Sequence, residues 1–120
     1  MASIGNSVLV IDSDPAVCAL LVALLQREGY TADVAEDAGK ALQLRRHGRH
    51  NAIIVEPRID GGDALLEQLH DGATNLIVVT TPDGPPPSPY EHTRGVHAVL
   101  FKPFEIGELA AAVASCCDAN

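Results

Sequence analysis

The chain has 120 residues and a formal net charge of −8, and 47% of its residues are hydrophobic. This length and hydrophobic fraction predict one folded domain and exclude an intrinsically disordered chain. The acidic excess argues against direct binding to nucleic acid or to an anionic membrane surface, and no apolar run is long enough to span a bilayer. With 3 cysteines and no signal peptide, we expect a reduced, cytoplasmic protein.

The first predicted unit is a strand followed by a helix. Residues 8–11 are branched and apolar and end at Asp12, which is typical of a strand buried on both faces. Asp14 then precedes Pro15, the pattern of a helix N-cap followed by proline at the first helical position. Gly29 ends this helix, and its apolar face is expected to be Val17, Leu20, Leu21, Leu24 and Leu25.

The same alternation of strand and helix continues to the end of the chain. Further strands are predicted over residues 31–35, 52–56, 76–80 and 98–101. Helices are predicted over residues 37–47, after Asp63 as a cap, and from about Glu105, the last with a buried face of Ile106, Leu109, Ala110 and Val113. The prolines of residues 82–89 predict an extended loop, followed by at most one or two helical turns over residues 90–94.

Strands that alternate with helices pair in parallel through right-handed crossovers. We therefore predict an α/β fold with a doubly wound, five-stranded parallel sheet, and a single domain over residues 1–120. Residues 1–6 are expected to be a loose N-terminal end. Residues 117–120 are expected to form a frayed C-terminus, with the Cys116–Cys117 pair at this helix end.

Polar residues follow four of the predicted strands. In an open sheet of this kind, ligands bind beyond the carboxyl ends of the strands. Carboxylates, hydroxyls and an ammonium group are therefore expected to meet at one edge of the sheet: Asp12, Ser13, Asp14, Glu56, Thr80, Thr81 and Lys102.

These segments resemble the receiver domains of two-component response regulators, and the resemblance runs from about Val8 to Val113. It is carried by VLVIDSDP at residues 8–15, IIVE at 53–56, VTT at 79–81 and LFKPF at 100–104. The resemblance implies a flavodoxin-type, CheY-like topology with strand order 2-1-3-4-5 and a shortened or irregular fourth helix. It also implies that Thr80 and Lys102 contact a phosphoryl group in working relatives, and that the Lys102–Pro103 bond is cis.

Two departures from the family pattern affect the phosphoacceptor chemistry. Family members usually carry an aspartate where Glu56 stands and a second acidic residue, which helps to hold Mg²⁺, where Ser13 stands. Serine removes a charge that the ion needs, and the longer Glu56 side chain displaces the attacking carboxylate. A displacement of about 1 Å can cost on the order of a hundredfold in rate. We therefore expect a degenerate site with no enzyme activity, no metal centre and no cofactor, and leave open weak Mg²⁺ binding at Asp12.

The positions that transmit the signal in the family also differ. Val99 stands in place of the usual aromatic switch residue, and Asp60 in place of a proline. Together with Thr80, Thr81 and Pro103, Val99 forms the expected switch and output positions.

These features predict a phosphorylation-independent, receiver-like signalling module that acts through protein–protein interaction in a two-component-type system. Its partner is expected to be a protein, and a homodimer is left open. Two alternatives remain: a functional phosphoacceptor receiver that uses Mg²⁺, and a small-molecule-binding, flavodoxin-like domain. Glu56 is expected either to mimic a phosphorylated aspartate or only to pair with Lys102.

Overall fold

The structure is a computed structural model that describes residues 7–48, 50–69, 75–82, 90 and 92–119. The predicted loose end at residues 1–6 and most of the proline-rich loop lie outside these residues. No described helix combines the length and the apolar character that crossing a membrane requires.

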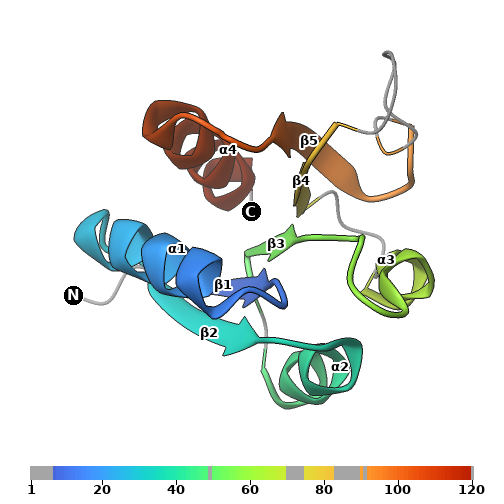
Figure 1. Ribbon diagram of the computed structural model, residues 1–120. Helices are drawn as coiled ribbons and strands as arrows, with labels where there is room; N and C mark the ends of the chain where they lie inside the picture. Colours follow the sequence, from blue (N-terminus) through green and yellow to red (C-terminus); the bar gives the residue numbers. More distant parts are fainter. Residues whose placement is uncertain (1–6, 49, 70–74, 83–89, 91, 120) are drawn as a thin grey trace.

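A five-stranded parallel sheet forms the centre of the molecule (Figure 1). Its strand order is β2-β1-β3-β4-β5, as predicted. The strands are β1 Ser7–Ile11, β2 Thr31–Ala35, β3 Ala52–Val55, β4 Leu76–Thr80 and β5 Val96–Phe101. β1, β3 and β4 are almost fully buried because they lie between two other strands and under helices on both faces.

The helices cover both faces of the sheet (Figure 1). They are α1 Pro15–Arg27, α2 Ala38–His47, α3 Gly62–Leu69 and α4 Ile106–Ala119. α1 and α4 pack on one face, where Leu21, Leu25, Leu109 and Val113 join the core. α2 and α3 pack on the other, where Ala41, Leu65, Leu66 and Leu69 join a second cluster. The carboxyl ends of the strands are left between these two layers.

The start of α1 agrees with the prediction. The Asp14 carboxylate accepts a hydrogen bond from the Ala16 amide at 2.9 Å, and Pro15 is the first helical residue. One predicted core position is wrong, because Leu20 is 50% exposed. Cys18 is buried, as its place in an apolar helical stretch predicts, since it shares the helix face of Leu21 and Leu25 at a spacing of three and seven residues.

The start of α3 differs from the prediction. Asp63 is not its cap, because the helix already begins at Gly62 and Asp63 lies in its first turn. Gly61 adopts a φ of +74°, and a Cβ on Gly62 would lie 2.0 Å from the carbonyl oxygen of Pro57. Two glycines in series therefore permit this close approach, and the helix starts two residues earlier than a cap at Asp63 implies.

The last helix also differs from the prediction. Ile106 is 48% exposed and so does not belong to its buried face. Cys116 does, since it is fully buried and extends the row of Leu109 and Val113 by one turn. α4 continues to Ala119, past the expected start of the frayed end. Burial raises the pKa of the Cys116 thiol to about 11, as for a cysteine used as a small apolar side chain.

The connection from β4 to β5 has no helix among its described residues. Thr81, Pro82, Tyr90 and residues 92–95 form turns and irregular structure, and the Thr93 amide donates to the Tyr90 carbonyl at 3.1 Å, as in a single turn. β5 begins at Val96, two residues earlier than expected.

Candidate functional site

Four side chains from four different strand ends gather at one edge of the sheet. Asp12 follows β1, Glu56 follows β3, Thr80 ends β4 and Lys102 follows β5. These strands are neighbours, and Asp12, Glu56 and Thr80 are only 4%, 8% and 2% exposed. The structure thus brings together the buried residues that the sequence predicted for this site.

The ammonium group of Lys102 lies between the two carboxylates. Its Nζ is 2.8 Å from Asp12 Oδ2 and 3.1 Å from Glu56 Oε1. Both contacts are short enough for charge-assisted hydrogen bonds. A single cation therefore holds the ends of β1, β3 and β5 together.

The protonation of Lys102 follows from these contacts. Burial alone would lower its pKa, since it disfavours the charged form. The hydrogen bonds and the negative charges of Asp12 and Glu56 outweigh burial, and the pKa lies above its ordinary value of 10.5. Lys102 therefore remains a cation at neutral pH.

The remaining oxygens of the two carboxylates are also hydrogen-bonded. Asp12 Oδ1 accepts from the Asp14 amide at 2.9 Å, and Glu56 Oε2 accepts from the Arg58 amide at 3.1 Å. Each oxygen of Asp12 and Glu56 thus has a donor within the protein. An incoming metal ion would have to share these oxygens with the donors already present and would meet the positive charge of Lys102.

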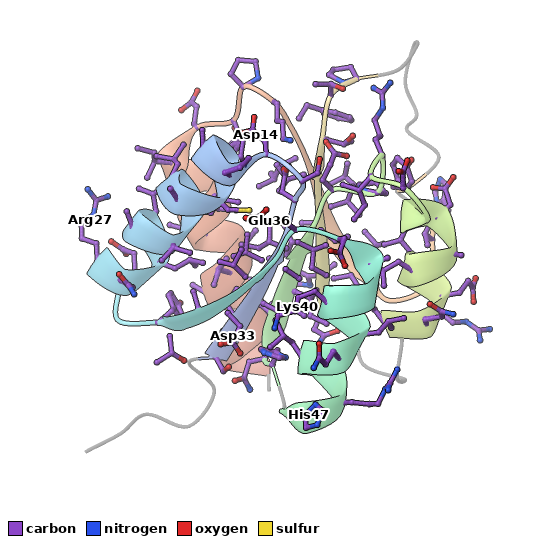
Figure 2. All side chains as sticks on the ribbon, turned by 60° about the horizontal axis from the view of Figure 1, so that its bottom comes forward. Asp14, Arg27, Asp33, Glu36, Lys40 and His47 are labelled. Atoms are coloured by element: carbon purple, nitrogen blue, oxygen red, sulfur yellow. The ribbon has the colours of Figure 1, made fainter. Side chains whose placement is uncertain are left out.

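Ser13 and Asp14 lie at the exposed rim of the site. Figure 2 shows Asp14 at the end of the molecule where α1 begins, far from Asp33 and His47 near the opposite end. Because its carboxylate caps α1, Asp14 serves the helix rather than the centre of the site.

The two hydroxyls at the end of β4 have different surroundings. The Thr80 hydroxyl oxygen is buried and has no hydrogen-bond partner among the described residues. The exposed Thr81 hydroxyl accepts a hydrogen bond of 2.7 Å from the guanidinium of Arg58. Arg58 was not predicted, because its contact spans 23 residues and follows no motif. The signal that the sequence offers for Arg58 is its position, since it is a cationic residue shortly after Glu56.

The other predicted output positions lie beside this centre. The Lys102–Pro103 peptide bond is cis, as the resemblance implied, and Pro103 is exposed. Val99 is half-buried and packs against the cluster under α2 and α3.

The donor set does not fit a magnesium ion. Mg²⁺ takes near-octahedral oxygen ligands, typically from one or two free carboxylates with water. Here the Lys102 ammonium bridges the two buried carboxylates, and the position next to Asp12 is a serine. Within residues 7–48, 50–69, 75–82, 90 and 92–119, no group of three or more His, Cys, Asp or Glu side chains is arranged to hold a metal.

Comparison with known proteins agrees with this fold. Residues 8–114 match the family model of the response regulator receiver domain. The chain therefore belongs to the receiver domains of response regulators, which are signalling modules of two-component systems.

Two curated relatives illustrate the range of family members. The response regulator MprA of Mycobacterium sp. (strain KMS) is 34% identical over 113 residues, which cover 87% of this chain and 47% of that protein. Protein PilH of Pseudomonas aeruginosa is 27% identical over 104 residues, which cover 82% of this chain and 86% of PilH. The chain thus spans about half the length of MprA and most of the length of PilH.

Solved structures show the same architecture. A CheY-like receiver domain from Methanospirillum hungatei superposes with a TM-score of 0.85 at 24% identity, covering 95% of this chain and 94% of its own. The response regulator StyR gives a TM-score of 0.83 at 27% identity, covering 95% of this chain and 60% of its own. The similarity to these two structures is evidence for the fold of the domain.

Proposed function

We propose that this receiver domain signals without being phosphorylated, by binding a protein partner in a two-component-type pathway. The observation that supports this proposal is the position of the Lys102 ammonium between Asp12 and Glu56. In a working receiver, a free carboxylate attacks the phosphoryl donor and Mg²⁺ neutralises the developing charge. Here the protein's own lysine holds both carboxylates.

The cost of opening this arrangement supports the proposal. Lys102, Asp12 and Glu56 are largely buried, and separating a buried ion pair is unfavourable by several kcal/mol. Both Glu56 oxygens already accept hydrogen bonds, one from Lys102 and the other from the Arg58 amide, and these donors reduce the nucleophilicity of the carboxylate.

A remaining role for magnesium is limited to Asp12. We propose that the domain functions without Mg²⁺ and that any binding at Asp12 is too weak to stabilise the fold, because the ion would meet the Lys102 ammonium at Oδ2. Glu56 acts mainly as the partner of Lys102. The same contact also gives Lys102 a permanent anion where relatives receive a phosphoryl group.

The experiment that tests this proposal uses four chains: the wild type, Ser13→Asp, Glu56→Asp and the double variant. Each is incubated with acetyl phosphate and Mg²⁺, and an acyl phosphate is sought by intact-mass spectrometry and peptide mapping. We expect none on the wild type or on either single variant, and phosphorylation at position 56 of the double variant. Asp60→Asn in the double-variant background is the control, because Asp60 is an exposed loop carboxylate near the site.

Two outcomes would contradict the proposal in different ways. An acyl phosphate on any carboxylate of the wild-type chain would overturn it. Phosphorylation of Glu56→Asp alone would show that Ser13 is not a defect, and that the length of the side chain is the only obstacle.

A functional phosphoacceptor is the second candidate, and one observation favours it. The buried Thr80 hydroxyl lacks a hydrogen-bond partner among the described residues, as expected for a donor that waits for a phosphoryl oxygen. Beryllofluoride with Mg²⁺, which imitates a phosphoryl group, distinguishes the candidates. A functional acceptor requires shifted amide NMR signals at Glu56, Thr80 and Lys102, whereas our proposal requires unchanged ones.

A further inference from the structure

The second helix, α2, has a charge opposite to that of the chain as a whole. Half of the 8 Lys and Arg residues lie within residues 38–55, and all 16 Asp and Glu residues lie outside this stretch. On α2 itself the basic residues are Lys40, Arg45, Arg46 and His47. The rest of the chain is therefore strongly acidic, whereas α2 is basic.

The exposed basic residues of α2 lie on its solvent side. Ala41 is buried and Leu44 packs against the same core cluster, so these two residues define the inner side of the helix. Lys40, Arg46 and His47 are exposed, and the helical turn of about 100° per residue places them away from Ala41. Lys40 and His47 are about 10 Å apart along the helix axis, and Figure 2 shows both on α2. We call Lys40, Arg46 and His47 the basic face.

The basic face is not neutralised within the described part of the molecule. Among the residues that the structure describes, no carboxylate forms a salt bridge with Lys40 or Arg46. Two acidic side chains close in sequence have other partners. The Asp37 carboxylate accepts a hydrogen bond from the Lys40 amide at 2.8 Å as the N-cap of α2. Asp33 lies 2.9 Å from the ring of the buried His50. A carboxylate from another molecule can therefore approach the basic face without displacing an internal partner.

Helix stability accounts for only part of this arrangement. Cations in the last turn of a helix are favourable because they lie at the negative end of its dipole. That effect explains Arg46 and His47, and also the single cation in the last turn of α1, Arg27. It does not explain Lys40, which lies in the first turn of α2, where the dipole disfavours a cation. Cations at both ends of one helix face instead favour a surface that binds anionic groups.

We propose that the basic face of α2 is a docking surface for the protein partner, and that the partner presents an acidic segment to it. The segment places two or three carboxylates within about 10 Å, the length of the face. Complementary charge of this kind sets the orientation and the association rate of a complex more than its affinity. The inference rests on the proposed function in one respect, namely that the partner is a protein.

The size of the basic face favours a protein segment over a nucleic acid. A nucleic acid strand carries one negative charge about every 3.4 Å along its whole length. Such a strand extends past the face and meets acidic residues of the adjoining sheet edge, since Asp33 in β2 and Glu36 directly after it are exposed. A short acidic protein segment ends where the face ends, and its remaining contacts can be uncharged.

The test titrates the isotope-labelled domain with a synthetic peptide of repeated Glu-Ala-Ala-Glu units at low ionic strength. We expect amide NMR shifts that concentrate on residues 40–47 and a dissociation constant that increases with added NaCl. Replacement of Lys40 and Arg46 together by glutamate should raise the constant about tenfold or more, because each change turns an attraction into a repulsion.

Two exposed cations away from α2 provide the matched control. Arg27→Glu together with Arg94→Glu changes the net charge by the same amount, and Arg27 occupies the last turn of its helix, as Arg46 does. We expect this pair to change the dissociation constant by less than about twofold. The amide spectra verify that both double variants are folded. Lys40→Gln with Arg46→Gln, which only removes the charges, should raise the constant about threefold and serves if the glutamate pair unfolds.

Three results would overturn the proposal. The first is an absence of amide shifts on α2 at millimolar peptide, and the second is an equal loss of binding in the control pair, since net charge alone would then decide. The third is tighter binding of an oligothymidylate of equal charge, which would make the face a nucleic acid site. No Mg²⁺ or phosphoryl donor is present, so failure of this docking is distinguishable from failure of the proposed function, which an acyl phosphate on the wild-type chain would overturn.

Discussion

At the scale of single residues, Lys102 decides the character of the site. Its motif was visible in the sequence, where lysine and proline follow a buried strand. The two carboxylates that it contacts are 90 and 46 residues away along the chain. Sequence reasoning identified all three residues and left open whether Glu56 reaches Lys102. The structure shows that it does, at 3.1 Å.

Replacement of this lysine should be strongly destabilising. Lys102→Met leaves Asp12 and Glu56 buried without their cation, and we expect the free energy of unfolding at pH 7 to fall by about 2–4 kcal/mol. Urea unfolding measures the change. Lys40→Met, at an exposed lysine of α2, is the matched control and should change it by no more than about 0.5 kcal/mol.

The pH dependence of this difference has a definite sign. The pKa of Lys102 is raised above 10.5 in the folded state, so its stabilising contribution is fully present below that pH. The contribution is lost as the pH rises through the higher folded-state value. The difference in stability between wild type and Lys102→Met should therefore shrink above about pH 10.5. A difference that grew with alkaline pH would contradict the assignment of the ammonium as the stabilising group.

At the scale of elements, local signals predicted where α1 begins better than where α3 begins. Asp14 and Pro15 act within the first turn of the helix, so their effect can be predicted from the sequence alone. The start of α3 depends instead on how closely the backbone of Gly62 approaches Pro57, which no local pattern shows. The same reason explains why Leu20 and Ile106 are exposed. Helical spacing shows which apolar residues could face the core, but the packing of the neighbouring layer determines which of them are buried.

Alanine at two glycines tests this explanation for α3. Gly62→Ala should destabilise the domain by about 2 kcal/mol or more, because its Cβ would meet the Pro57 carbonyl oxygen at 2.0 Å. Gly107→Ala, in the first turn of α4, has no neighbour within 4 Å and should stabilise by roughly 0.5–1 kcal/mol through helix propensity. Equal effects of the two changes in thermal unfolding would show that the close approach is unimportant.

At the scale of the whole molecule, the sheet places four strand ends at one edge. The chain as a whole carries a net charge of −8. Such a charge favours cations in general, so a specific magnesium site must be distinguished from ionic screening. A site filled at a hundred times its Kd would add about 2.7 kcal/mol to the stability.

Melting in two salts separates these effects. We expect MgCl₂ to raise the Tm of the wild-type chain no more than NaCl of equal ionic strength does, because the carboxylates of Asp12 and Glu56 are already paired. The double variant Ser13→Asp with Glu56→Asp should gain several degrees from MgCl₂ alone. A specific gain in the wild type, removed by Asp12→Asn, would instead reveal a magnesium site at Asp12.

The sequence by itself determined the layout of this protein: five strands in a doubly wound sheet, the residues at the strand ends, and the two positions where they depart from the receiver pattern. These features follow from hydrophobic periodicity and short motifs, which act over a few residues. Only the tertiary structure decided that Lys102 contacts both carboxylates, that Arg58 binds Thr81 and that Cys116 is core. Each of these depends on contacts between distant segments, whose distances are set by the packing of the whole chain.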